Sequence, residues 1–296
     1  MGDLVSVIVP TYRRNHSLSR TLHSLLDQTY TNIEIIVVDD NSDEKYCKKV
    51  NEIILNIKDF RVKYIRNSSN LGSALSRNHG IEVSSGIYVT FLDDDDEYTP
   101  DKIMSQIEFM VKNDLDYSIT DLALYNEKNE LVRKRKRTYI KSYDNVTLLK
   151  YHLMFHMTGT DTMMFKKSFL DEIGRFDPID IGDEFYLIFK AIKAEGRFGY
   201  LPECNIKATL HENFGLSTSD RKIQGEKNLL AFKKNSFVYL ENKEIQYIKM
   251  RYYAVVAYVY LKKRNYFKFI INSLYSFIQK PISLILDIIR LVKGET

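Results

Sequence analysis

The alternation of short apolar runs with helical patterns limits the fold of this chain more than any other feature. Over the first 120 residues, runs rich in Val and Ile alternate with segments that carry apolar residues at helical spacing. Strands and helices are expected, in turn, at residues 6–10, 17–28, 33–40, 44–57, 62–66, 72–84 and 87–92. Such alternation is typical of a mostly parallel sheet with helices on both faces. The sequence therefore predicts an α/β fold.

The pattern changes beyond residue 120. Residues 121–140 alternate like a β-hairpin around a polar turn, and residues 182–196 form a short helix that begins with two acids. From about residue 219 the chain is helical and rich in Tyr, Phe and Lys. We therefore predict a catalytic or binding domain over residues 1–215 and a C-terminal helical region over residues 216–296.

Charge and cysteine content narrow the class of protein. The chain has 43 basic and 39 acidic residues, a net charge of +4, which gives no reason to expect a nucleic-acid partner. Cys47 and Cys204 lie far apart without a CxxC motif, which suits a reducing cytosol. The first residues lack the basic start of an export signal, and no run of about 18 uncharged apolar residues predicts a spanning helix. A cytoplasmic location is expected.

An acidic run follows the expected strand at residues 87–92, with four aspartates at 93–96 and then Glu97. Two unit charges about 4 Å apart repel by roughly 1 kcal/mol in water and about 4 kcal/mol at an effective dielectric constant near 20. One offset is the N-terminus of the helix that follows, which favours acids. The other is a divalent cation such as Mg²⁺ or Mn²⁺, because both prefer carboxylate oxygens. Asp39 and Asp40 also end a strand, and parallel sheets bind ligands beyond such strand ends.

Five motifs occur in a fixed order over about the first 220 residues. They are "VSVIVPTYRR", "SLLDQTYTNIEIIVVDDNSDE", "NLGSALSRNHGIEVSSGIYVTFLDDDDEYTPDKI", "TMMFKKSFLDEIGRFD" and "GDEFYLIFKAIKAEG". Together they resemble the family 2 glycosyltransferases, which use nucleotide sugars. The resemblance implies a Rossmann-like GT-A sandwich, a UDP-sugar donor and a bound cation; the helical tail lies outside it.

The resemblance assigns the nucleotide site to the ends of the first two strands. It implies that Asp40 accepts the N3 proton of a uracil ring, that Tyr12 stacks on the base, and that Pro10 and Thr11 shape the pocket. Asp39 lies beside this site. The alternative is that Asp39 and Asp40 only cap the turn that follows them.

The helix expected at residues 72–84 contributes two further candidates. Gly72 permits close backbone approach at the helix start, where amide donors favour phosphate or ribose oxygens. The resemblance implies that Arg77 faces the nucleotide. An exposed, solvated arginine is the alternative.

The same resemblance places the metal motif on Asp93, Asp94 and Asp95, and Asp95 is the first choice as direct ligand to Mn²⁺ or Mg²⁺. The cation would neutralise the donor diphosphate and stabilise the departing nucleoside diphosphate. His211 is a candidate third ligand, although a lone histidine is more often structural. Asp96 is expected to cap the helix that follows the acidic run.

The remaining chemistry needs a base and a cover for the diphosphate. A carboxylate is the usual group that takes the proton of an acceptor hydroxyl, and the alignment of Lys190 with a family arginine places Glu184 at the base position. Asp183 is the competing base. A single base opposite the leaving group implies inversion at the anomeric carbon. Arg221 and Lys222 are expected to close over the diphosphate.

Two regions, a basic run and the helical tail, suggest what the protein binds besides its donor. The run "RKRKR" at residues 133–137 is expected to be a solvated hairpin strand, with recognition of a phosphate-bearing acceptor or an anionic membrane as the alternative. The tail is expected to pack on the catalytic domain and touch the inner face of the cell membrane, and a homo-oligomer is left open. The expected acceptor is a cell-envelope glycan or a lipid-linked intermediate.

Two rival functions fit parts of the sequence. A sugar-nucleotide pyrophosphorylase shares the architecture and the metal, but it needs a Gly-rich phosphate loop after the first strand, where "PTYRRNHS" has no glycine. A non-catalytic carbohydrate-binding protein on the same fold needs no intact acidic motifs. The identity of the sugar and of the linkage does not follow from the sequence.

Overall fold

The computed structural model describes residues 2–179, 181–211 and 220–292. Contacts within the chain divide it into two compact units, one formed by Met1–Tyr143 with Met157–Leu210 and the other by Asp144–His156 with His211–Thr296. The division into a domain over residues 1–215 and a helical region over residues 216–296 remains a prediction.

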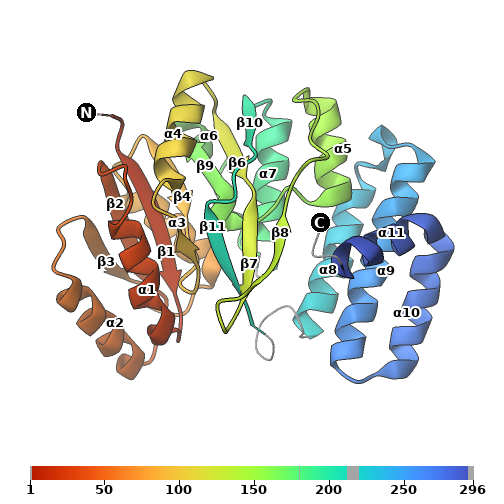
Figure 1. Cartoon of the computed structure of the whole chain (residues 1–296), viewed down its shortest axis with the longest axis horizontal. Coiled ribbons are helices and arrows are strands. Elements are labelled where there is room, and N and C mark those ends of the chain that lie inside the picture. Colours follow the sequence, from red (N-terminus) through yellow and green to blue (C-terminus); the bar gives the residue numbers. More distant parts are fainter. Residues whose placement is uncertain (1, 180, 212–219, 293–296) are drawn as a thin grey trace. The chain divides into compact units, whose positions relative to one another are not determined.

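A seven-stranded sheet forms the centre of the first unit (Figure 1), in the order β10-β6-β9-β4-β1-β2-β3. Its strands are β1 (Val5–Thr11), β2 (Ile33–Asp39), β3 (Val62–Arg66), β4 (Tyr88–Phe91), β6 (Tyr117–Thr120), β9 (Met163–Lys166) and β10 (Phe198–Leu201). Every pairing is parallel except those of β9, which runs antiparallel to both β4 and β6. The prediction of a mostly parallel sheet in an α/β fold is confirmed.

Helices accompany this sheet as the alternating pattern predicts. They are α1 (Asn15–Leu26), α2 (Glu44–Ile57), α3 (Ser73–Val83), α4 (Lys102–Lys112), α6 (Lys167–Glu172) and α7 (Asp183–Lys193). Because Gly80 has no side chain, α3 packs tightly on the sheet: a Cβ at Gly80 would lie 2.5 Å from Ile8 Cγ2 and 3.2 Å from Val38 Cγ2. This close contact fixes the start of α3 relative to the ends of β1 and β2.

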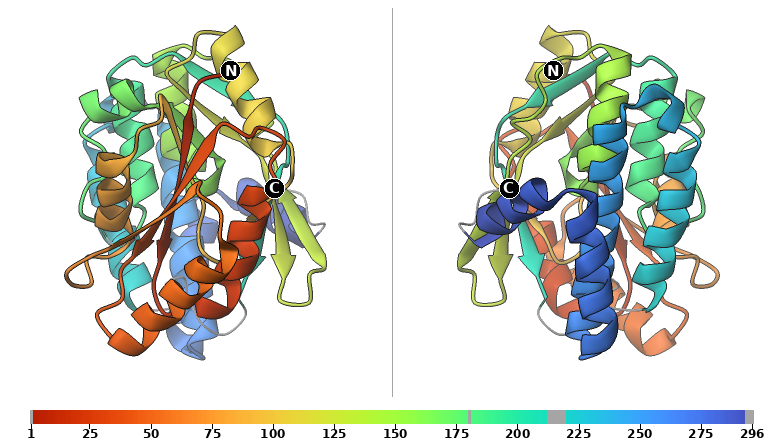
Figure 2. Two further views of the ribbon diagram at one scale, coloured as in Figure 1. Left: turned by 90° about the vertical axis from the view of Figure 1, so that its left-hand side faces the viewer. Right: turned by 90° about the vertical axis from the view of Figure 1, so that its right-hand side faces the viewer.

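A second, four-stranded sheet belongs to the same unit, in the order β5-β11-β7-β8. Its strands are β5 (Glu97–Tyr98), β11 (Ile206–Leu210), β7 (Leu122–Asn126) and β8 (Leu131–Arg135). β7 and β8 form the predicted antiparallel hairpin, which Figure 2 shows from two further sides. Lys134 and Lys136 are exposed as expected of a solvated strand. The expectation is wrong for Arg137, which is buried and donates to the backbone oxygens of Thr120 and Thr158.

The second unit is helical, as the sequence predicts. It contains α5 (Asn145–Phe155), α8 (Asp220–Lys234), α9 (Asn242–Lys262), α10 (Tyr266–Gln279) and α11 (Pro281–Val292). The last carbonyls of α5 accept hydrogen bonds from two basic side chains: Lys233 Nζ lies 2.8 Å from the oxygen of Leu153, and Arg251 Nη1 lies 3.3 Å from that of Phe155. These hydrogen bonds satisfy carbonyls that have no partner inside the helix, so they hold α5 within this unit.

Among the described helices, none is both long and apolar enough to cross a membrane by itself. α10 and α11 meet the length and composition test only as a pair, and a bend of 116° separates them.

Short 3₁₀ helices at Thr160–Thr162 and Phe237–Tyr239 complete the described elements.

Candidate active site

The carboxyl ends of β1, β2 and β4 lie at one edge of the main sheet, because these strands are parallel neighbours. Thr11 ends β1, Asp39 ends β2, and Asp93 follows β4 after one further residue. The Thr11 hydroxyl donates to Asp94 Oδ2 at 2.7 Å, so the first strand is joined directly to the acidic run. The fold therefore brings the two predicted acidic groups to the same edge of the sheet.

The first two aspartates of the run have different partners. Asp93 accepts from Arg77 Nη2 at 2.7 Å, and its side chain is 41% exposed. Asp94 is buried and accepts from Thr11 and from the backbone nitrogen of Tyr12 at 3.4 Å. Burial raises the pKa of Asp94 to about 7, with a further contribution from Asp95, although the hydrogen bond from Thr11 opposes the shift.

The next two aspartates are also engaged. Asp95 forms an ion pair with Arg14, whose side chain is 42% exposed. Asp96 accepts a hydrogen bond from the backbone nitrogen of Thr209 at 2.7 Å. The expectation that Asp96 caps the following helix is wrong, because α4 begins only at Lys102 and the Asp96 carboxylate binds β11 instead.

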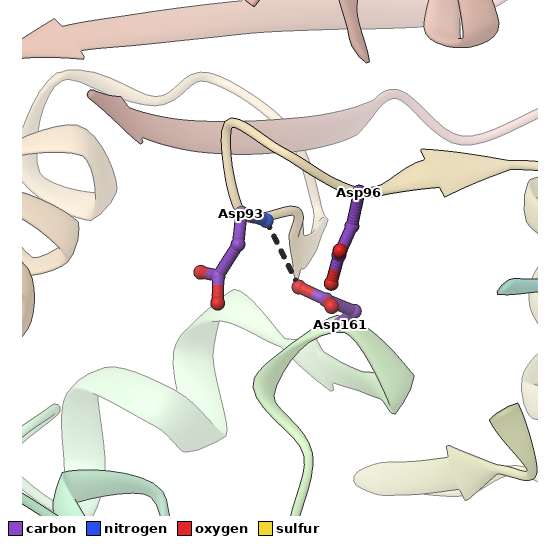
Figure 3. Close-up of side chains that lie close together, drawn as sticks. All are labelled: Asp93, Asp96 and Asp161. Atoms are coloured by element: carbon purple, nitrogen blue, oxygen red, sulfur yellow. Dashed lines mark hydrogen bonds between the residues drawn. The ribbon is translucent and has the colours of Figure 1, made fainter. Parts of the chain in front are cut away.

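Asp93, Asp96 and Asp161 form a cluster of carboxyl groups whose oxygens lie within 4.8 Å of one another. Figure 3 shows the Asp96 side chain pointing toward that of Asp161, which accepts a hydrogen bond from the backbone nitrogen of Asp93 at 2.9 Å. Burial raises the pKa of Asp96, and repulsion from Asp161 raises it further. Burial also raises the pKa of Asp161, and there the further contribution comes from Asp93. Carboxylate oxygens at this spacing can hold a divalent cation.

Asp161 was not among the predicted site residues. It lies in the 3₁₀ turn before β9, and it reaches the acidic run because β9 is inserted between β4 and β6. The sequence signal is weak: one aspartate in "GTDTMMF", two residues before the first residue of β9. Nothing in that signal shows which strand lies next to β9.

Arg77 connects the acidic run to the start of α7. Its side chain is buried, and while Nη2 binds Asp93, Nη1 donates to Asp183 Oδ2 at 2.8 Å. Burial lowers the pKa of the guanidinium, but Asp93 and Asp183 raise it by more. Arg77 is therefore not the exposed, solvated arginine of the alternative prediction. Its role toward a nucleotide remains a prediction.

The two acids expected to include the base lie in the first turn of α7. Gly182, with φ of 81° in the left-handed region, precedes them. Asp183 is buried against Arg77, whereas Glu184 is partly exposed. Burial and then the neighbouring Asp183 raise the pKa of the Glu184 carboxyl group. A raised pKa makes the carboxylate a stronger proton acceptor, and the ionised form that accepts the proton prevails above that pKa.

Asp39 and Asp40 both accept several hydrogen bonds from the protein. Asp39 accepts from Tyr64 and from the backbone and side chain of Asn41, at 2.7–2.9 Å. Asp40 accepts four bonds of 2.8–2.9 Å, from Asn67, Asn70, Leu71 and Gly72. A carboxylate has about four lone-pair sites, so a uracil N3–H would have to replace one of the four donors to Asp40. The recognition of uracil by Asp40 remains a prediction.

The other predicted nucleotide residues lie around this network. Tyr12 is 41% exposed, and the Arg13 guanidinium lies 5.1 Å from the centre of its ring. Pro10 is partly buried near the end of β1. Gly72, with φ of 83°, is the N-cap of α3. A small cavity of about 90 Å³ lies at this helix start, lined by Leu71, Gly72, Ser73, Ala74, Leu75, Pro178 and Ile179.

Three predicted site residues belong to the second unit. His211 and Arg221 are exposed, and Lys222 forms an ion pair with Glu226 at 2.7 Å. The loop that joins His211 to α8, at residues 212–219, lies outside the described residues. The roles of His211, Arg221 and Lys222 toward cation and diphosphate therefore remain predictions.

Comparison with known proteins identifies one family for this chain. A family model described as "Glycosyl transferase family 2" matches residues 6–173. An uncharacterized glycosyltransferase of Haemophilus influenzae is 39% identical over 152 residues, which are 50% of this chain and 57% of that protein. The Escherichia coli protein named UDP-Glc:alpha-D-GlcNAc-diphosphoundecaprenol beta-1,3-glucosyltransferase WfgD is 34% identical over 145 residues, 48% of this chain and 56% of that protein. The matched parts thus span little more than half of these two relatives.

A solved structure shares the fold. The crystal structure of S. aureus TarS 1–349 in complex with UDP-GlcNAc aligns with a TM-score of 0.58 and 17% sequence identity, over 95% of this chain and 91% of that one. At this identity the likeness concerns the fold alone.

Proposed function

This chain belongs to glycosyl transferase family 2, and from that membership we propose that it moves a sugar from a UDP-sugar donor to a hydroxyl group of a cell-envelope glycan or lipid-linked acceptor. One observation carries the proposal: Arg77 joins the acidic run to the acid pair of α7 through Asp93 and Asp183. Cation site and base would thereby share one rigid network. The printed name of the E. coli relative, with a UDP-Glc donor and a diphosphoundecaprenol acceptor, supports the substrate classes.

We propose that Asp93 and Asp95 hold the Mn²⁺ or Mg²⁺ of the donor complex. The donor set fits, because both ions prefer carboxylate oxygens. Asp93 is partly exposed, and Asp95, although buried, forms its ion pair with Arg14, whose side chain is 42% exposed. The Asp96 and Asp161 carboxylates accept hydrogen bonds from the backbone nitrogens of Thr209 and Asp93, so we assign them the role of supporting the turn. The cation, when bound, neutralises the diphosphate and stabilises the leaving group.

Glu184 is the proposed base. Its raised pKa equips it to take the proton of the acceptor hydroxyl, while Asp183 is held by Arg77. Attack by that hydroxyl on the side opposite the diphosphate inverts the anomeric carbon. Asp183 is the alternative base, because it lies in the same helical turn.

The remaining contacts follow from the family resemblance. Tyr12 would stack on uracil through its exposed ring, and Asp40 would exchange one of its loop donors for the base. Gly72 presents the start of α3 to the donor phosphates or ribose. His211 would complete the cation site, and Arg221 and Lys222 would cover the diphosphate.

We place the protein at the cytoplasmic side, attached peripherally to the inner face of the cell membrane. Cys47 and Cys204 are free thiols, which suits a reducing compartment. A lipid-linked acceptor would itself lie at the membrane.

Release of UDP from a panel of UDP-sugars tests the proposal, with Mn²⁺, Mg²⁺ or a chelator present. Asp95→Asn should abolish turnover and weaken Mn²⁺-dependent UDP binding, whereas Glu184→Gln should abolish turnover and leave UDP binding almost unchanged. Asp161→Asn is compared with these variants, because Asp161 belongs to the other candidate cation site, the cluster of Asp93, Asp96 and Asp161. Sugar binding without any UDP release would favour the non-catalytic carbohydrate-binding protein, and release of pyrophosphate from UTP and a sugar phosphate would favour the pyrophosphorylase.

A further inference from the structure

The helix α10 in the second unit presents an apolar face to solvent. Phe267, Ile270, Leu274 and Ile278 recur at helical spacing, and they are 75%, 55%, 56% and 70% exposed. The opposite side of α10 packs on α9, where the Ser276 hydroxyl donates to the backbone oxygen of Met250. A helix of a globular protein normally buries such a face, so this one has no partner within the described residues.

The helix α11 repeats the pattern. Ile282, Ile285, Leu286 and Ile289 lie at helical spacing and are 74%, 48%, 47% and 44% exposed. No residue of α11 is buried within the part of the chain that the structure describes. The two helices thus expose consecutive apolar faces, one on each side of the bend near Pro281.

The geometry of these helices is unsuited to crossing a bilayer. Helices of 14 and 12 residues are about 21 Å and 18 Å long, whereas the hydrocarbon core is about 30 Å thick. The bend of 116° sets α11 across the direction of α10 (Figure 2). Short amphipathic helices with this composition lie in the plane of a membrane interface.

The charge of this segment identifies the surface that it fits. Residues 262–290 contain six basic residues and one acid, a net charge of +5, although the whole chain has only +4. The basic residues are Lys262, Lys263, Arg264, Lys268, Lys280 and Arg290. Basic residues beside an apolar helical face attract anionic headgroups, whereas a second copy of the same face would bring two segments of like charge together.

We propose that α10 and α11 dock on the surface of a bilayer that contains anionic lipids, with their apolar faces against the acyl chains and their basic residues among the phosphates. Tyr266 and Tyr275, both at least half exposed, are the kind of side chain found at headgroup level. This inference goes beyond sugar transfer and uses residues of the second unit alone.

Sedimentation of the full chain with vesicles tests the inference. Vesicles of phosphatidylcholine are compared with vesicles of phosphatidylcholine and phosphatidylglycerol. The wild-type chain should bind the anionic vesicles at least tenfold more strongly, and added salt should weaken that binding. A chain with Ile278→Glu and Ile282→Glu should lose the binding, because it places acids in the apolar faces.

Phe60→Glu is the matched control, because Phe60 is 93% exposed on the first unit; this variant should bind like the wild type. Equal binding to both kinds of vesicle, or full binding by the double variant, would overturn the inference. So would a lipid-free dimer, seen by sedimentation velocity, that the double variant converts to monomer. UDP release on a water-soluble acceptor is measured in parallel, and it should not change in the double variant, which separates this inference from the proposed activity.

Discussion

The guanidinium of Arg77 lies between two carboxylates, Asp93 after β4 and Asp183 at the start of α7. Asp93 is partly exposed, whereas Asp183 and Arg77 are almost completely buried. A buried ion pair of this kind contributes little net stability, but removal of one partner leaves a charge without compensation in a dry site. Arg77 therefore matters for stability through the carboxylates that would remain without it.

Arg77→Met should lower the free energy of unfolding by about 3 kcal/mol, because Asp183 stays buried without its counter-charge. Urea denaturation followed by circular dichroism measures the change. Arg66→Met is the control: its pair with Glu44 is largely exposed, so the loss should be much smaller than for Arg77→Met. If both variants lose the same free energy of unfolding, then leaving Asp183 buried without Arg77 costs no more than breaking an exposed ion pair.

The raised pKa of Glu184 predicts how activity depends on pH. Only the carboxylate form accepts a proton, so kcat/KM should fall as the pH drops through the raised pKa and level off above it. Because Asp183 contributes to that shift, Asp183→Asn should move the acidic limb of the profile to lower pH while activity persists. If Asp183→Asn abolishes activity and Glu184→Gln keeps it, Asp183 is the base.

At the scale of single residues, the sequence predicts which residue types gather at the strand ends, but not their partners. Asp39, Asp40 and the aspartates at 93–96 lie at one sheet edge because parallel neighbouring strands leave no other place for them. The partner of Asp96 is Thr209, 113 residues away, and that of the Asp93 backbone is Asp161, 68 residues away. Such contacts depend on how distant segments pack, which local patterns do not encode.

The position of α3 depends on one close contact with the sheet. Gly80→Ala places a methyl group 2.5 Å from Ile8 Cγ2, and overpacking of this kind typically costs about 1–3 kcal/mol. The gain in helix propensity from Gly to Ala, about 1 kcal/mol, offsets part of this loss.

We therefore expect Gly80→Ala to lower the midpoint of thermal unfolding. UDP binding should weaken as well, because α3 begins at the Gly72 amide that binds Asp40. Glu82→Ala, at an exposed position of the same helix, should leave both measurements unchanged. A Gly80→Ala chain as stable as the wild type would mean that α3 can move away from β1 without cost.

The elements themselves follow largely from local pattern. The helix predicted at residues 44–57 has those bounds in the structure, because its apolar spacing and its Asp43 cap agree. The antiparallel direction of β9 was not predictable, since the direction of a strand depends on the side from which the chain enters the sheet. β5, with two residues, is too short to leave a pattern.

The two compact units of the chain are not two consecutive stretches of sequence. Composition changes near residue 215, but α5, an insertion between β8 and β9, has its contacts with the later helices. Its Leu148 and Leu153 side chains are fully buried. Lys233 and Arg251, which bind the carbonyls at its end, come from α8 and α9. No local pattern in residues 145–155 distinguishes a helix of one unit from a helix of the other.

A chain that ends at residue 215 should therefore fold poorly, because it keeps α5 but loses Lys233, Arg251 and the other helices of the same unit. Aggregation and dye binding to exposed apolar surface measure this. The matched variant replaces residues 144–156 by a flexible linker of about eight Gly and Ser residues, which reaches roughly 16 Å, the length of the 11-residue helix. This variant retains the first unit without an uncovered helix, so it should stay monomeric. Equal behaviour of the two truncated chains would show that α5 does not need the second unit.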